Sequence, residues 1–357
     1  FLKIMLKQPT PEKVIDIIWF SVALSFCWPL PSNSSRARIL VYKSLQISCI
    51  VNACLLLLAL IYAIYLHLDD VFIISECICL FIGVNQIVIQ IIICMIKHDS
   101  LQRVVEEMLN CVREAQQYER EIYCKLITKC SIFFGSSMVC IYLTSTAFSI
   151  GPAFMSVYFP CDAEYPFRVN YTPVNVIIYM HQVVLSYQCA AHICLSIFGA
   201  LLLWFSAARF ECLIIELKET TSISTLIVCT KKQLRLRRYA EEVINILRLI
   251  VLYAIVVNTG VLTLCGIILL LDTPLIVRVQ FIISCLTVLT EIYIYTWPAD
   301  YMKDMSISVS RSAYDIIWYE QTLEMQKDIL NILAYQEPVT LSISCIIPEL
   351  TLRYFCS

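Results

Sequence analysis

Charged residues are scarce in this sequence. Only 15% of its 357 residues are charged and 59% are hydrophobic, against roughly 25% and 45–50% for soluble domains. So little polar surface cannot coat a water-soluble globule of this size. The net charge of −2 and the lack of a basic tract interleaved with aromatic residues also argue against nucleic-acid binding.

Glycine and catalytic motifs are scarce as well. Six glycines leave little material for the broken helices and close helix crossings of many transporters. No Gly-rich phosphate loop, metalloprotease motif or nucleophile elbow occurs, so we expect neither an enzyme nor a cofactor. Most of the 19 cysteines lie in apolar runs, where cysteine behaves as a small hydrophobe. Cys189, His192 and Cys194 have no zinc-ligand spacing, and we expect no metal.

Long apolar runs dominate the remainder of the chain. Crossing a hydrocarbon core of about 30 Å takes about 20 residues, and six runs are long enough. These candidate spans are 39–66, 71–96, 126–150, 174–205, 249–271 and 274–297. The sequence therefore predicts an all-α, polytopic membrane bundle. A shorter apolar stretch, 17–27, makes a poor signal peptide, because Pro9 and Pro11 precede it and Trp28-Pro29 follows. We expect it to form a short helix on the membrane surface.

The distribution of lysine and arginine predicts the orientation. These residues gather before the first span, in 97–125, in 206–248 and after the sixth span, whereas the connection 151–173 has only Arg168. Because basic connections stay in the cytoplasm, we expect a cytoplasmic N-terminus. The connection 151–173 then faces outward, and Asn170 in Asn170-Tyr171-Thr172 is an expected glycosylation site.

The long cytoplasmic connections carry apolar residues at helical spacing among charges. This pattern occurs at 99–112, 234–247 and 314–323. We expect helices that extend the spans, and these either cap their spans or form a shared intracellular interface. The basic run 231–238 reflects the positive-inside bias, with contact to anionic lipid as a second role.

Several short motifs follow one another in a distinctive order. They are Trp28-Pro29, Ala208-Arg209-Phe210-Glu211-Cys212-Leu213, Arg238-Tyr239-Ala240-Glu241-Glu242, the stretch 292–300, Ala313-Tyr314-Asp315 with Trp318-Tyr319, and Gln336-Glu337-Pro338-Val339 followed by 348–355. On the topology argued above, their order and spacing resemble the insect odorant receptors over nearly the whole chain.

The resemblance implies a seven-span, odorant-receptor-like bundle. Its parts would be a cytoplasmic segment 1–38 with a short interfacial helix, six transmembrane helices with long intracellular connections in 39–297, intracellular anchor helices in 298–338, and an incomplete seventh, pore-lining span in 339–357. On this pattern the protein is the odorant-binding subunit of a heteromeric, ligand-gated cation channel in the plasma membrane of olfactory neurons. It would form a hetero-tetramer with an odorant co-receptor subunit. Tyr314, Trp318, Tyr319 and Pro338 would lie at the anchor, the interface between subunits. A gustatory-type chemoreceptor channel or, less readily, a G-protein-coupled receptor are the alternatives.

A pocket for small, volatile, apolar ligands needs aromatic and apolar walls with one or two polar handles. On this topology the outer halves of four spans and the connection 151–173 supply candidates, for each of which helix packing is the alternative role. The candidates are Glu76, Leu80, Tyr142, Thr146, Tyr158, Phe159, Tyr179, His181, Tyr187, Phe281, Ser284 and Cys285. Glu291, an ionisable residue in the sixth span, has either a function there or reaches the nearby interface.

Overall fold

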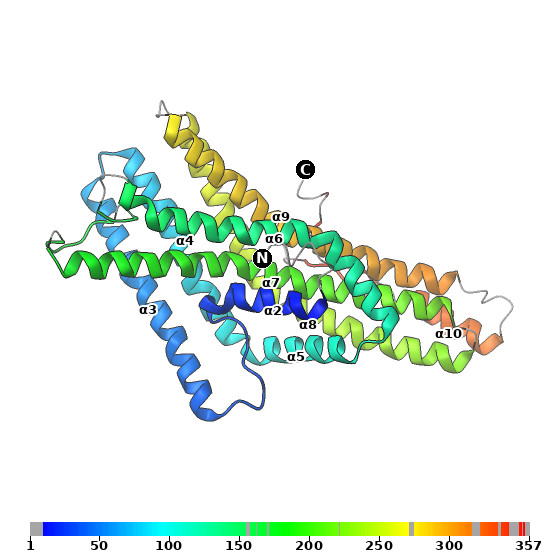
Figure 1. Cartoon of the computed structure of the whole chain (residues 1–357). Coiled ribbons are helices and arrows are strands. Elements are labelled where there is room, and N and C mark those ends of the chain that lie inside the picture. Colours follow the sequence, from blue (N-terminus) through cyan, green and yellow to red (C-terminus); the bar gives the residue numbers. More distant parts are fainter. Residues whose placement is uncertain are drawn as a thin grey trace.

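The structure is a computed structural model in which the described part of the chain is helical and contains no β-strand (Figure 1). The described residues are 10–154, 158–161, 163–169, 171–220, 222–270, 275–315, 322–334, 337–342, 350–351 and 353. The helices in chain order are α2 (Pro11–Val22), the short 3-10 helix η1 (Ala23–Ser25), α3 (Arg36–Leu66), α4 (Val71–Ile96), α5 (His98–Glu114), α6 (Gln117–Phe154), α7 (Val174–Lys218), α8 (Ile223–Leu270), α9 (Leu275–Tyr314) and α10 (Leu323–Ala334).

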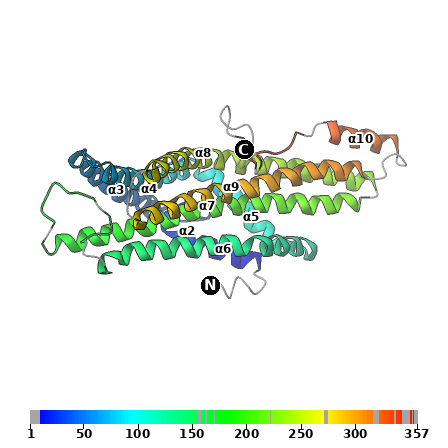
Figure 2. The ribbon, with the colours of Figure 1, turned by 90° about the horizontal axis from the view of Figure 1, so that it is seen from above.

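Six of the described helices are long and apolar enough to cross a membrane, namely α3, α4, α6, α7, α8 and α9. They correspond to the six apolar runs of the sequence and confirm a helical membrane bundle. Four of them continue far beyond their apolar runs, because α6 begins at Gln117, α7 ends at Lys218, α8 begins at Ile223 and α9 ends at Tyr314. These extended ends lie together in the half of the molecule that carries α10 (Figures 1 and 2).

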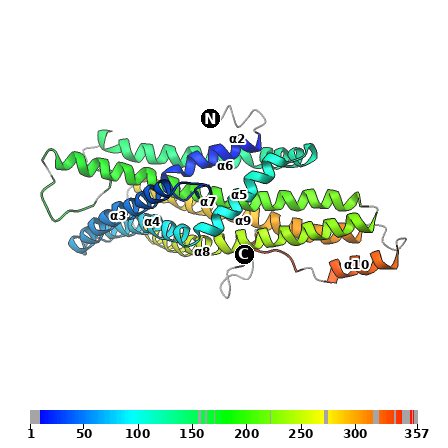
Figure 3. The same cartoon turned by 90° about the horizontal axis from the view of Figure 1, so that it is seen from below.

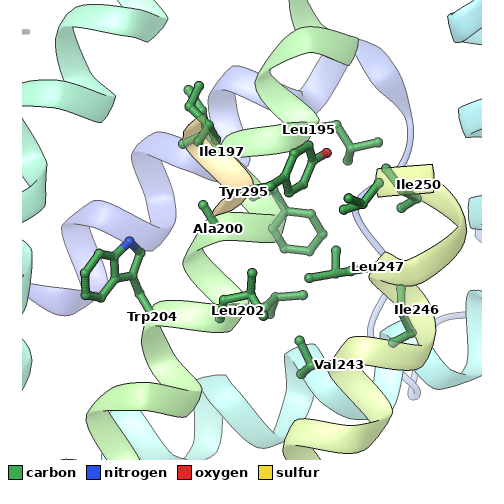
Figure 4. Packing of buried hydrophobic residues seen from close by; sticks show 14 of the residues in the cluster. Leu195, Ile197, Ala200, Leu202, Trp204, Val243, Ile246, Leu247, Ile250 and Tyr295 are labelled. Atoms are coloured by element: carbon green, nitrogen blue, oxygen red, sulfur yellow. The ribbon is translucent and has the colours of Figure 1, made fainter. Parts of the chain in front are cut away.

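Helix α7 is the centre of the bundle, with α6, α8 and α9 packed along it (Figure 3). In its most apolar window 83% of the residues are buried, against 39% or less in the other five candidate spans. Small residues such as Gly199 and Ala200 let the neighbours approach closely. A Cβ at Gly199 would lie 2.9 Å from Leu247 of α8 and 3.1 Å from Tyr295 of α9, and Figure 4 shows these two side chains packed against this part of α7 in the buried core. Helices α6, α8 and α9 are therefore held in place by α7, whereas α3 packs mainly on α4 and α4 mainly on α3 and α8.

The N-terminal helix α2 packs against α6 and α7. It begins at Pro11, upstream of the apolar stretch 17–27, because proline is well accommodated in a first helical turn. Val14, Ile18 and Val22 lie on its buried face. Spacings of four residues place them on one side of the helix, so an apolar stripe binds α2 to the bundle.

The Trp28-Pro29 segment joins three helices. The Trp28 ring lies 4.7 Å from the ring of Phe198 in α7, measured between centroids. The Tyr42 hydroxyl of α3 donates to the Trp28 carbonyl at 2.6 Å, and Gln102 Nε2 of α5 donates to the Leu30 carbonyl at 2.7 Å. Backbone groups that have no partner in a helix are thus bonded by side chains.

Ion pairs connect the extended helix ends. Arg209 of α7 contacts Glu107 of α5 at 2.8 Å, and its guanidinium lies over the ring of Tyr239 at 5.7 Å. Arg103 of α5 pairs with Glu242 of α8. Three of these residues, Arg209, Tyr239 and Glu242, belong to the short motifs singled out above. Those motifs therefore occupy helix crossings in the charged half of the bundle.

Candidate functional site

The apolar part of the bundle contains a cavity of ≈520 Å³ between α6, α7 and α9. Small-molecule sites usually fall between about 300 and 1,000 Å³, so the space suits a small organic ligand. Leu56 of α3, Leu80 and Val84 of α4, and Cys161 complete its wall. Exposed lining residues, among them Phe148 and Thr287, show that the cavity opens between α6 and α9.

Each of the three main helices contributes one continuous face to this cavity. Residues three or four positions apart lie on the same side of an α-helix, and the lining residues follow that spacing. They are Phe133, Ser136, Ser137, Cys140, Ile141, Thr144, Ser145 and Phe148 from α6; Gln182, Leu185, Ser186, Cys189 and Ile193 from α7; and Ile283, Leu286, Thr287, Thr290, Glu291 and Ile294 from α9. The wall is mainly apolar with scattered hydroxyl groups.

Glu291 is the ionisable group among the described lining residues. Its side chain is buried at 7% exposure, and its Oε1 accepts a hydrogen bond from Gln86 Nε2 of α4 at 3.1 Å. The suggestion that Glu291 reaches the interface at the end of its span is therefore wrong. A carboxyl held at membrane depth is costly unless it is bonded, and the Gln86 amide supplies that bond.

A second buried polar pair lies deeper in the bundle. His192 Nδ1 of α7 is 2.9 Å from Gln90 Oε1 of α4, and both side chains are at most 2% exposed. This bond connects α7 to α4 one helical turn beyond Gln86. Among the described residues no cluster of His, Cys, Asp or Glu has the geometry of a metal site.

Comparison with known proteins decides the family. The family model of the 7tm odorant receptor matches residues 73–357. The chain belongs to the odorant receptor family. This receptor is a multi-pass membrane protein, and the family match favours the odorant branch over the gustatory and G-protein-coupled alternatives. No curated protein matches its sequence.

Two solved structures share the receptor's fold. The insect olfactory receptor OR5 from Machilis hrabei superposes with a TM-score of 0.78 at 14% identity, covering 97% of this chain and 94% of that one. The same OR5 in complex with eugenol gives a TM-score of 0.77 at 14% identity, with the same coverage. The likeness thus extends over almost the whole of both chains and identifies the receptor's helices as an insect olfactory receptor bundle.

Four of the residues proposed for the pocket from the sequence lie between helices. The Tyr142 hydroxyl of α6 donates to the Ser21 carbonyl of α2 at 2.5 Å. Thr146 Oγ1 lies 3.1 Å from the Tyr187 hydroxyl, and the Tyr179 hydroxyl donates to the Ser149 carbonyl at 2.7 Å. These contacts join α6 to α2 and α7, which is the helix-packing role considered as the alternative.

The other proposed residues are spread over several places. Leu80 lies in the cavity wall, and His181 Nε2 is 3.0 Å from the Asn52 carbonyl of α3. Phe281 is buried in a small cluster between α8 and α9 that includes Cys285. Ser284 and Glu76 each take part in an interaction with another residue. Tyr158 is 73% exposed, and Phe159 contacts Tyr165 at 6.4 Å between ring centroids.

The residues proposed for the anchor and for glycosylation are only partly described. Tyr314 is 59% exposed at the end of α9. Pro338 is also exposed, although the next residue, Val339, is buried and its N–H donates to Ser306 Oγ at 3.1 Å. Trp318, Tyr319 and Asn170 lie outside the described residues, so their roles remain predictions.

Seven of the lining residues that the sequence argument missed are serines and threonines. Ser137, Thr144, Ser186, Thr287 and Thr290 all border the cavity. Their signal in the sequence is the recurrence of small hydroxyl residues at helical spacing within apolar runs. That pattern marks helix faces with little side-chain bulk, where space is left between neighbouring helices.

Proposed function

We propose that this odorant receptor is the odorant-binding subunit of a heteromeric, ligand-gated cation channel and that the cavity between α6, α7 and α9 holds the odorant. The observation that carries the proposal is an apolar cavity of ≈520 Å³ within the membrane-spanning part of a member of this family. Binding there rests mainly on burial of apolar surface, worth roughly 25 cal/mol per Å². A ligand with little polar surface, small enough to be volatile, suits such a wall.

The extended half of the bundle supports the subunit role. Helix α10 carries Leu323 and Leu330 at 69% and 54% exposure, and Tyr314 nearby is 59% exposed. Leu323 and Leu330 are seven residues apart, so they lie on one face of α10 and give a partner subunit an apolar stripe to contact. On this proposal the region around Tyr314, with Trp318, Tyr319 and Pro338, contacts neighbouring subunits, one of them an odorant co-receptor, in a tetramer.

The proposal can be tested by recording odorant-evoked currents from cells that express the receptor with a co-receptor subunit. A panel of small volatile compounds should open a cation current in the wild type. The variant Thr287→Trp should lose sensitivity to these compounds by at least about tenfold, because the indole would occupy the cavity that Thr287 borders.

Thr263 offers a matched control. Like Thr287, it is an exposed threonine in a candidate span whose Oγ1 donates to the carbonyl four residues earlier, but it is not part of the cavity lining. Thr263→Trp should keep the wild-type sensitivity at equal surface expression. If both variants respond like the wild type, the odorant does not occupy this cavity. If no compound opens a current with any co-receptor, the channel role is wrong.

A further inference from the structure

The hydroxyl groups of the cavity direct their protons into the protein. On α6, Ser136 and Ser137 both donate to the Phe133 carbonyl, at 3.0 and 2.9 Å, and Thr144 donates to the Cys140 carbonyl at 2.9 Å. On α9, Thr287 and Thr290 donate to carbonyls four residues earlier, at 2.9 and 2.7 Å. Such back-bonding leaves the oxygen lone pairs, not the protons, available to a ligand.

The remaining hydroxyl pair, between α6 and α7, is also satisfied internally. Ser145 Oγ and Ser186 Oγ are 2.7 Å apart, and Ser186 Oγ donates to the Ser145 carbonyl at 3.3 Å. If Ser186 donates to that carbonyl, Ser145 donates to Ser186. The protons of both hydroxyls are then used, and the two oxygens again offer only acceptor sites.

The amide of Gln182 is engaged at both ends. Its Oε1 accepts from the Cys161 N–H at 2.9 Å, and its Nε2 donates to the Tyr165 hydroxyl at 3.2 Å. The second N–H of the Gln182 amide, beside Cys161, is not used in these two bonds. Among the described lining residues it is the one strong hydrogen-bond donor that has no bond of its own. The rest of the wall offers acceptors, apart from the weak donors of the cysteine thiols.

Glu291 adds a carboxyl group, whose oxygens accept hydrogen bonds. Its Oε1 is bonded to Gln86, which does not line the cavity, whereas Glu291 does. The Gln86 amide and the nearby Asn258 amide both approach the carboxyl from outside the cavity, and its remaining lone pairs are available to a ligand. None of the described lining residues is a lysine, arginine or histidine, so the carboxyl has no cationic partner in this wall.

We infer that the cavity selects odorants that carry a hydrogen-bond donor, a hydroxyl or an amino group, over those whose polar atom only accepts, such as ethers, ketones and esters. This inference rests on the proposed function. A donor on the ligand can pair with Glu291 or with a back-bonded hydroxyl oxygen. An ether, ketone or ester oxygen would lose its hydrogen bonds to water on binding and would meet few hydrogen-bond donors in the wall. Burying a polar group without a hydrogen-bond partner is costly.

The test compares isomeric or near-isomeric pairs on cells that express the receptor with its co-receptor. Suitable pairs are 1-hexanol with methyl pentyl ether and cyclohexanol with cyclohexanone. The donor of each pair should reach half-maximal current at an about 3- to 10-fold lower concentration, the factor that one net hydrogen bond supplies. Equal potency within the pairs, or a preference for the ether and ketone, would overturn the inference.

The variant Glu291→Gln sharpens the test. Gln86 Nε2 should still require an oxygen from residue 291, so the new amide nitrogen should point to the cavity and provide a donor there. The ratio of half-maximal concentrations, ether to alcohol or ketone to alcohol, should then fall towards one, because the receptor becomes more sensitive to the ether and the ketone. Comparing the ratio between variants removes differences in partition into the membrane.

Ile294→Val is the matched control, since it changes the shape of the wall one turn from Glu291 and leaves its polar groups intact. It should shift both members of a pair alike and preserve the ratio. Responses to both members without preference contradict only this inference, whereas the absence of any odorant response contradicts the proposed function as well. A ratio that is unchanged in Glu291→Gln would show that Glu291 does not select the ligand.

Discussion

Adding one methyl group at Gly199 should destabilise the receptor, although alanine is the better helix former. A Cβ there would lie 2.9 Å from Leu247 Cδ2 and 3.1 Å from Tyr295 Cε1, and both neighbours are only 2% exposed. Overpacking of this kind costs about 1–3 kcal/mol, while replacing a helical glycine by alanine returns at most about 1 kcal/mol. For Gly199→Ala we expect a net loss of about 1 kcal/mol, the middle of the range that these two terms leave.

The controls are Gly83 and Gly266, which also lie in spans and where a Cβ would have nothing within 4 Å. Gly83→Ala and Gly266→Ala should leave stability unchanged or raise it by up to about 1 kcal/mol. The assay is the midpoint of thermal inactivation of detergent-solubilised receptor, followed by size-exclusion chromatography after stepwise heating. A midpoint for Gly199→Ala at or above those of both controls would refute the close packing of α7 against α8 and α9.

A double-mutant cycle tests which neighbour is responsible. Leu247→Val alone should cost about 0.8 kcal/mol, the value of one buried methylene. It also removes the Cδ2 atom that the new methyl group would meet, so the two substitutions together should cost less than the sum of their separate costs, by at least about 0.5 kcal/mol. Strict additivity would mean that Leu247 does not confine Gly199.

Two further predictions concern the charged half of the bundle. Arg209→Gln should lower the midpoint of thermal inactivation, because it removes the ion pair with Glu107 and the contact with Tyr239. Since Glu107 is 47% exposed, the ion pair contributes about 1 kcal/mol or less. The difference in midpoint between variant and wild type should become smaller in high salt; a difference that does not change with salt would assign the effect to packing. Burial, reinforced by nearby carboxylates such as Glu119, raises the pKa of Cys212 to about 12. The Cys212 thiolate is therefore rare at pH 8. Labelling of Cys212 by a maleimide, measured by peptide mass spectrometry, should be slow until the protein unfolds. Rapid labelling of the native receptor would contradict the burial of this thiol.

The sequence predicts the spans well because apolar runs of about 20 residues have few alternatives in a membrane protein. Hydropathy alone predicts the helix ends poorly, although the helical spacing at 234–247 predicts that a helix extends the fifth span, and α8 confirms it. The apolar run of the fifth span begins at 249, whereas α8 begins at Ile223, because an amphipathic stretch continues the same helix without a break in its backbone bonding. Hydropathy detects the lipid-facing part of a helix, and the wet part must be recovered from the spacing of residues such as Tyr239 and Val243, which are buried in α8.

The cavity is harder to predict than the spans, because successive residues on a helix differ by about 100° in direction. Aromatic residues such as Tyr142 and Tyr179 are reasonable candidates by type. A tyrosine within a bundle must bond its hydroxyl, however, and here carbonyls of adjacent helices supply the partners. The cavity is bordered by small residues such as Ser137 and Ser186, whose side chains leave space between the helices. Which face of a helix is crowded depends on its neighbours, and a single sequence does not fix them.

Helix α9 gives a physical reason for one of the motifs found in the sequence. It runs unbroken from the cavity wall at Ile283 to Tyr314 and contains Pro298. Proline has no N–H, so the carbonyl of Ile294, the last cavity residue of α9, loses its helical partner. Trp297, the residue before Pro298, packs against Trp204 of α7 at 5.2 Å between ring centroids. This contact holds α7 and α9 together where α9 lacks one backbone hydrogen bond. The backbone of α9 thus lacks one of its own hydrogen bonds where the helix leaves the cavity and passes into the charged half of the bundle.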